Sequence, residues 1–151
     1  MSFYESSTFE PNVSVGYLLR VTNQMAGAGL EHVFADEGMS GIQWQVMLAL
    51  QFGAASNCAE LARHLNHDKG AMTRLVDQIA AHGWITRERD ADDRRHVRLA
   101  LTDSGRDVAL HAKDRVLSCW NSWLGDWSHE EIAGLIAGLQ KLRTTLSAVV
   151  A

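Results

Sequence analysis

Apolar residues from position 15 onward recur at intervals of three and four, which is the spacing of one face of an α-helix. The positions on this face are Val15, Leu18, Leu19, Thr22, Ala26, Leu30, Val33 and Phe34. Gly27 and Gly29 interrupt the pattern, and each costs about 1 kcal/mol relative to alanine in a helix interior. Residues 1–11 are polar and end at Pro11. We therefore expect a flexible arm followed by a long helix over about 12–37.

Polar residues mark where further helices begin. In a capping box, a side-chain oxygen and a Glu or Gln three residues later satisfy free backbone amides at a helix start. Three such boxes are Ser40 with Gln43, Asn57 with Glu60, and Ser128 with Glu131. The first predicts a helix to about Gln51 and the second a short helix to about Leu65. Asp68 can cap another helix, which should end at Gly83 because glycine suits the left-handed position after a helix.

The periodicity changes from helical to alternating after this glycine. Residues 84–87 are typical of a strand, and residues 97–101 alternate between apolar and more polar side chains. Residues 90–95 between them are almost all charged and predict an exposed turn. The two strands should therefore form a β-hairpin that projects from a helical body. A helix is expected to resume after Thr102 and to continue to about Leu124.

The last predicted helix has apolar residues at alternating intervals of three and four, a heptad spacing typical of helix–helix seams. They are Ile132, Leu135, Leu139, Leu142, Leu146 and Val149. Trp120, Trp123 and Trp127 precede this helix, and three large aromatic side chains so close together favour an interface core. We therefore expect a helical homodimer. The alternative is a core helix within a single chain.

The composition is that of one globular domain. The chain has 151 residues, of which 46% are hydrophobic and 21% charged, so disorder and fibrous repeats are excluded. It contains neither a run of roughly 18 apolar residues, as a membrane span requires, nor a signal-peptide pattern. The two cysteines, Cys58 and Cys119, are too few for a disulfide scaffold. We expect a helical, cytoplasmic protein with no membrane partner.

The charge distribution is more informative than the net charge of −4. Residues 63–98 carry eight basic and six acidic side chains, whereas the rest of the chain carries six basic and twelve acidic ones. Local charge matters more than total charge for attraction to a polyanion such as a nucleic acid. A solvated surface of mixed charge would give the same counts, so this feature alone leaves both interpretations open.

Several segments resemble the MarR (multiple-antibiotic-resistance regulator) family. Residues 68–77 and 82–87 resemble the recognition helix and the start of the wing in that family, and residues 41–48 resemble its second helix. The hairpin resembles the family pattern D-x-R-x-x-x-L-x-L-T. This pattern is carried here by Asp93, Arg95, Leu99, Leu101 and Thr102, with Gly105 following. The resemblance covers about residues 13–149.

This resemblance implies a mainly α-helical fold, a winged helix-turn-helix body with a two-stranded β wing, in one domain over residues 1–151. The DNA-binding body would span about 40–102, with dimerisation helices at 12–37 and 103–150. The implied function is a ligand-responsive, sequence-specific regulator of transcription that binds double-stranded DNA. Such a regulator would act as a repressor, bind a palindromic operator as a homodimer, and be released by a small aromatic or phenolic effector.

The candidate DNA-binding residues follow from this arrangement. A recognition helix enters the major groove, and its first two turns would here present Lys69, Ala71, Thr73 and Arg74. At the hairpin tip, the guanidinium of Arg95 suits a narrow minor groove, and Arg94 competes for that role. By resemblance, Asp93 braces the wing through Arg95 or a neighbouring arginine. The alternative for Arg74 is a surface ion pair with Asp77 or Glu60.

The effector pocket is expected between the dimerisation helices and the DNA-binding body. Its candidate lining residues, each of which also fits an ordinary core position, are Trp44, His111, Trp120 and Trp123. Thiol-based redox sensing is an alternative mechanism, because the start of a helix lowers the pKa of a thiol such as that of Cys58. His64 and His67 lack the spacing of a recognised metal motif. No catalytic motif is present, so we expect neither an enzyme nor a cofactor.

Overall fold

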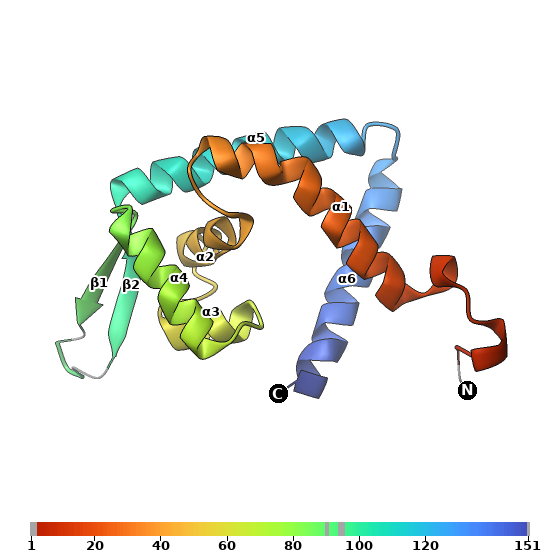
Figure 1. The fold of residues 1–151 in the computed structure, drawn as a ribbon, viewed down its shortest axis with the longest axis horizontal. Helices are drawn as coiled ribbons and strands as arrows, with labels where there is room; N and C mark the ends of the chain where they lie inside the picture. Colours follow the sequence, from red (N-terminus) through yellow and green to blue (C-terminus); the bar gives the residue numbers. More distant parts are fainter. Residues whose placement is uncertain (1–2, 90, 94–95, 151) are drawn as a thin grey trace. The chain divides into compact units, whose positions relative to one another are not determined.

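The computed structural model describes residues 3–89, 91–93 and 96–150. The described chain divides into two compact units, residues 1–115 and residues 116–151. Its helices and strands are labelled in Figure 1. They are the 3-10 turns Ser6–Thr8 and Pro11–Val13, α1 (Val15–Asp36), α2 (Gly41–Gln51), α3 (Cys58–His64), α4 (Lys69–Ala81), β1 (Ile85–Arg89), β2 (Val97–Leu101), α5 (Asp103–Trp123) and α6 (His129–Val150). The mainly helical fold with a two-stranded wing is thus confirmed.

Side-chain caps set most helix starts where the sequence predicts them. Ser40 and Gln43 form a complete capping box at α2, with Gln43 N donating to Ser40 Oγ and Ser40 N donating to Gln43 Oε1. At α6, Ser128 and Glu131 exchange the same pair of hydrogen bonds, at 2.8 and 3.2 Å. These bonds satisfy amides that a helix leaves unpaired. The first and third predicted capping boxes are therefore confirmed.

The second predicted box is only half formed. Asn57 Oδ1 accepts from Glu60 N at 2.9 Å, as expected for the cap of α3. The Glu60 carboxylate, however, accepts from the amide and the hydroxyl of Ser56, at 2.7 and 2.8 Å, instead of from the Asn57 amide. Ser56 is the preferred partner because its amide and its hydroxyl both donate to the same carboxylate oxygen of Glu60. Its own carbonyl accepts from Leu99 N at 2.8 Å, which joins this loop to the wing.

Helix α4 begins and ends as predicted. Asp68 Oδ1 accepts from Ala71 N at 2.8 Å at its start. After the last helical residue, Gly83 has a φ of +76°, a left-handed conformation that glycine adopts without a steric penalty. The turn is held from the other end of the hairpin, because the hydroxyl of Thr102 donates to the Gly83 carbonyl at 2.7 Å.

The wing is an antiparallel hairpin in which Ile85 pairs with Leu101 and Arg87 with Leu99. The first strand begins one residue later than predicted and extends to position 89. In Figure 1 the hairpin projects from one end of the helical body. Helix α5 starts two residues after β2. A side chain at Gly105 in its first turn would collide with the backbone of Trp84, because an added Cβ would lie 2.1 Å from the Trp84 carbonyl oxygen.

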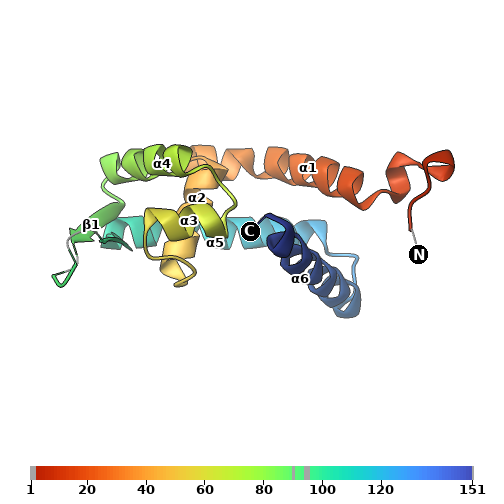
Figure 2. The same ribbon diagram turned by 90° about the horizontal axis from the view of Figure 1, so that it is seen from below.

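Apart from Val116, the buried hydrophobic side chains belong to the unit of residues 1–115. They come mainly from α1 to α5 and the two strands of the wing, elements that can be followed in Figure 2. The largest fully buried side chains are Val33, Val46, Met47, Leu61, Met72, Val76 and Ile79. Leu99 from β2 is also buried and brings the wing into the same core. This shared core fixes the orientation of α4 relative to the wing.

In the unit of residues 116–151, by contrast, most large apolar side chains are exposed. Helix α6 has no buried residue within its described span. Large apolar side chains are instead exposed along this unit, at Leu117, Trp120, Trp123, Trp127, Leu135, Ile136, Leu139, Leu146, Val149 and Val150. So many exposed large apolar side chains on two successive helices favour an interaction surface. None of the helices in the described part of the chain combines the length and the hydropathy of a membrane span.

Candidate nucleic-acid interface

Helix α4 has one buried face and one face in solvent. Met72, Val76 and Ile79 are fully buried against the core. Lys69, Thr73 and Arg74 are exposed on the other side, whereas Ala71 and Leu75 are half-buried at the boundary. The three-and-four spacing of the apolar residues produces this division. The first two turns of α4 therefore present polar and cationic groups to any ligand that approaches from solvent.

The alternative prediction for Arg74, a surface ion pair with Asp77 or Glu60, is wrong among the residues that the structure describes. Arg74 forms no ion pair there, because both proposed acidic partners are engaged elsewhere: Asp77 pairs with Arg87, and Glu60 accepts from Ser56. The guanidinium of Arg74 lies back toward the start of the helix, 3.9 Å from the position that a Cβ on Gly70 would occupy. The hydrogen-bond donors of the Arg74 guanidinium are therefore available to a ligand.

Thr73 presents its methyl group rather than its hydroxyl. The hydroxyl donates to the Lys69 carbonyl of the preceding turn at 3.0 Å. A threonine that bonds back to its own helix in this way leaves its methyl group free for apolar contact. Asp68 caps the helix at the same end, so the first amides of α4 are already partly satisfied by a carboxylate.

The loop of the wing is closed by its own residues where it is described. His96 N donates to the Asp93 carbonyl at 3.0 Å, and His96 Nε2 lies 3.5 Å from the Asp93 carboxylate. Arg94 and Arg95, the predicted tip residues, lie outside the described residues. The expected brace between Asp93 and an arginine therefore stays a prediction.

An ion pair joins α4 to β1, and it was not predicted from the sequence. A terminal nitrogen of Arg87 donates to Asp77 Oδ1. Arg87 pairs with buried Leu99 in the sheet, so its side chain lies on the sheet face that meets the body. An arginine on the inward face of a hairpin, with an aspartate on the preceding helix, was the signal that could have revealed this pair.

Cys58 has the opposite pKa shift from the one predicted. It is the first residue of α3, where the helix start was expected to lower the thiol pKa. Burial raises the pKa of Cys58, because the thiolate loses hydration; Arg87 opposes this effect and Asp77 adds to it. The thiol is thus less ionised than an ordinary cysteine at neutral pH.

The predicted effector residues fall into two groups. In the first unit, Trp44 Nε1 donates to the Ala109 carbonyl at 3.1 Å, and its ring packs 5.3 Å from that of Phe34. His111 Nδ1 lies 2.7 Å from Glu37 Oε1 in the same unit. In the second unit, Trp120 and Trp123 pack edge to face at 5.2 Å. A shared pocket for the two groups stays a prediction.

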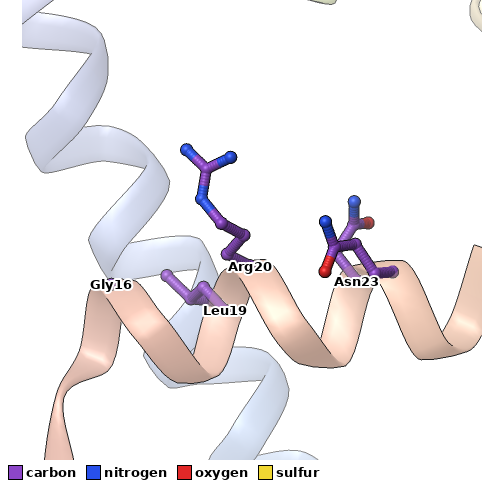
Figure 3. Close-up of a pocket in the computed structure, with 5 residues that line it drawn as sticks. Gly16, Leu19, Arg20 and Asn23 are labelled. Carbon is purple, nitrogen blue, oxygen red and sulfur yellow. The ribbon is translucent and has the colours of Figure 1, made fainter. Parts of the chain in front are cut away.

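Two hollows open on the first unit. One lies along α1, where Arg20 and Asn23 extend from the same side of the helix (Figure 3). The other lies at the base of the wing and is lined by polar side chains of α2, α3, β2 and α5. Neither is lined by a predicted effector residue. The described residues also include no cluster of three metal-binding side chains.

Several known proteins have sequences similar to that of this chain. The family model described as the MarR family matches residues 37–96. The multiple antibiotic resistance protein MarR of Escherichia coli is 28% identical over 103 residues, which are 68% of this chain and 72% of that protein. An uncharacterized HTH-type transcriptional regulator of Bacillus subtilis, YdgJ, is 27% identical over 131 residues, or 87% of this chain and 78% of its own length.

Solved structures show the same fold. A mutant of Escherichia coli MarR in complex with operator DNA gives a TM-score of 0.77 at 25% identity, covering 91% of this chain and 99% of its own. CouR from Rhodococcus jostii bound to p-coumaroyl-CoA gives 0.79 at 21% identity, with 89% and 95% coverage. The matched family consists of transcription regulators and not of enzymes. Over its winged-helix body, including α4 and the wing, the chain is similar to the MarR family of transcriptional regulators.

Proposed function

We propose that this protein is a sequence-specific DNA-binding repressor of transcription whose helix α4 enters the major groove. The observation that carries the proposal is the exposed face of α4, where Arg74 has no ion-pair partner among the described residues while Met72 and Val76 hold the opposite face in the core. The similar Escherichia coli protein in complex with operator DNA supports the same use of the fold.

Each residue on this face has a distinct role in the proposal. Arg74 pairs with a guanine edge or a phosphate, for which its planar guanidinium is suited. The outward methyl group of Thr73 and the side chain of Ala71 contact thymine methyl groups. Lys69 contacts the phosphate backbone. Arg94 or Arg95 enters the adjacent minor groove, where negative potential is enhanced in A·T-rich DNA.

The protein acts as a homodimer in this proposal. The exposed apolar positions of α6, including Leu135, Leu139 and Leu146, supply a seam that a second copy can cover. A two-fold dimer places two recognition helices about 34 Å apart, one turn of B-DNA. The operator is then a short inverted repeat in double-stranded DNA.

Release from the operator is assigned to a small aromatic or phenolic effector. A ligand shifts such an equilibrium only if it binds the two spacings of the recognition helices with different affinity. The proposed pocket residues are Trp44, His111, Trp120 and Trp123. The similar regulator CouR, solved with p-coumaroyl-CoA, supports control by a ligand with an aromatic group. Redox sensing by Cys58 is the weaker alternative, because burial raises the pKa of its thiol.

In vitro selection from a pool of random duplexes tests the proposal. The full-length protein is expected to enrich one inverted repeat with half-sites about one helical turn apart. The Arg74→Ala variant, selected in parallel, should relax the preference at one base pair in each half-site. Failure of the wild-type protein to enrich any sequence would overturn the proposal. Enrichment of a single half-site without symmetry would overturn the dimeric part of it.

A further inference from the structure

A glutamine in the core contacts the exposed side of α4. Gln43, in the first turn of α2, is only 9% exposed. Its Nε2 donates to Oε1 of Gln78, in the third turn of α4, at 3.2 Å. Gln78 itself is exposed and lies one turn after Arg74, on the same side of the helix. A buried side chain thus holds a neighbour of the arginine that is proposed to read the operator.

The backbone fixes the orientation of the Gln43 side-chain amide. The backbone nitrogen of Ser40 is a donor, and it donates to Gln43 Oε1 at 2.9 Å. The nitrogen end of the Gln43 side chain therefore faces Gln78, where it requires an acceptor, and the acceptor of a glutamine side chain is its oxygen. Two successive hydrogen bonds thus link the backbone at the start of α2 to a side chain of α4.

These hydrogen bonds determine what Gln78 offers to a ligand. Its Oε1 is engaged by Gln43, whereas its Nε2 forms no hydrogen bond within the described part of the chain. A side-chain amide nitrogen carries two N–H donors and no acceptor. Gln78 therefore presents hydrogen-bond donors on the side of α4 that also carries Arg74.

We propose that Gln78 contacts a base in the major groove, and that Gln43 is the positioning residue that leaves the donors of Gln78 to make this contact. A glutamine that is free at both ends of its amide pairs with adenine, which presents one donor and one acceptor there. With its oxygen held by Gln43, Gln78 instead favours an acceptor, which guanine presents at O6 and N7 and thymine at O4. This inference rests on the proposed function and adds a base preference at a second position of each half-site.

Selection from random duplexes by the full-length protein and its variants tests the base contact. The wild-type protein should prefer guanine or thymine at a position whose preference Arg74→Ala retains. Gln78→Ala should lose that preference and bind the selected duplex roughly fivefold more weakly or worse, with its affinity for a scrambled duplex unchanged. Gln78→Glu keeps an acceptor for Gln43 but presents a carboxylate oxygen to the groove. Its preferred base should therefore change to cytosine, whose N4 is a donor.

Gln43→Met tests the positioning role, because methionine is a similarly long, unbranched side chain that lacks the donor. Gln78 is then free at both ends of its amide, so the preference at its base pair should move to adenine, whereas the position read by Arg74 should not change. Gln45→Met alters an exposed glutamine of the same helix and should select the wild-type sequence. A purely structural role of Gln43 would instead lower the affinity for every sequence alike.

NMR spectra of the side-chain amides in the wild-type protein check the same assignment without any variant. The selected duplex should shift the Nε2 protons of Gln78. Those of Gln43 should exchange slowly with solvent before DNA is added, because the group is buried and hydrogen-bonded. Nε2 protons of Gln78 that the selected duplex leaves in place would contradict the contact.

The selection experiment separates failure of this inference from failure of the proposed function. If the wild-type protein selects an inverted repeat and Gln78→Ala keeps every base preference, the base contact of Gln78 is wrong and the proposed function stands. If Gln43→Met keeps the wild-type preference at the base pair of Gln78, the positioning role is wrong. A wild-type protein that enriches no sequence would overturn the proposed function and this inference together.

Discussion

Arg87 of β1 is ion-paired with Asp77 of α4, so the first strand of the wing is joined to the helix that is proposed to read the operator. Both side chains are partly exposed, at 42% and 58%. An exposed pair of this kind adds at most about 1 kcal/mol to stability. Its main consequence is geometric, because it restrains the direction of the wing relative to the groove-facing side of α4.

The variant Asp77→Asn separates this positioning role from simple electrostatics. Removal of a negative charge near the DNA would by itself strengthen binding. We expect the reverse, several-fold weaker binding to the selected operator, because the wing is no longer held at its angle. Anisotropy titrations at fixed salt measure the change. Tighter binding by Asp77→Asn would show that the pair does not position the wing.

The buried and exposed faces of α4 should respond differently to truncation. Met72→Ala leaves a cavity in the core and should cost about 2–5 kcal/mol of unfolding free energy. Thr73→Ala, one residue away on the exposed face, should change stability by less than about 0.5 kcal/mol while weakening operator binding. Urea denaturation and anisotropy measure the two effects. A large loss of stability in Thr73→Ala would contradict the assignment of faces.

Leu139→Asp tests the proposed dimer seam. A charge at this exposed apolar position of α6 must be buried if a second copy covers it, so the variant should be monomeric in light scattering. Gln140→Asp places the same charge on the next residue, away from the seam, and should stay dimeric. If Leu139→Asp also remains a dimer, the interface lies on another surface.

Cys58 should react slowly with thiol reagents near neutral pH. Its raised pKa means that the reactive thiolate becomes abundant only above the range of an ordinary cysteine, so the rate of alkylation should still be rising at pH values where a free thiol has levelled off. Mass spectrometry of the Cys119→Ser variant isolates this rate. The Cys58→Ser variant should bind the operator as the wild-type protein does, and peroxide should affect the operator binding of both proteins equally. A peroxide response that disappears in Cys58→Ser would instead support redox sensing.

Local chemistry explains which elements could be predicted from the sequence. The caps at Ser40, Asp68 and Ser128 depend on residues three positions away, and the wing follows from alternation within five-residue strands. These signals are contained in short segments. The recognition helix was predictable for the same reason, because its buried and exposed residues follow one helical period.

Features that depend on distant packing were not predictable. The Glu60 carboxylate accepts from Ser56, whose carbonyl is held by the amide of Leu99, 43 positions further along the chain. The pKa of Cys58 depends on burial, which local helix geometry does not describe. The pairing of Arg87 with Asp77 requires the hairpin to fold back onto α4. In each case, residues from another element determine the outcome.

The most direct test of DNA recognition by α4 is fluorescence anisotropy of the wild-type protein and Arg74→Ala on the selected duplex and on a scrambled duplex, at two salt concentrations. We predict that the wild-type protein binds the selected duplex at least about 10³-fold more tightly than the scrambled one. Arg74→Ala should lose about 1–3 kcal/mol on the selected duplex alone when Arg74 contacts a guanine edge, and should weaken binding to both duplexes when it contacts a phosphate. Equal affinity of the wild-type protein for both duplexes, or an unchanged affinity in Arg74→Ala, would contradict recognition through this face of α4.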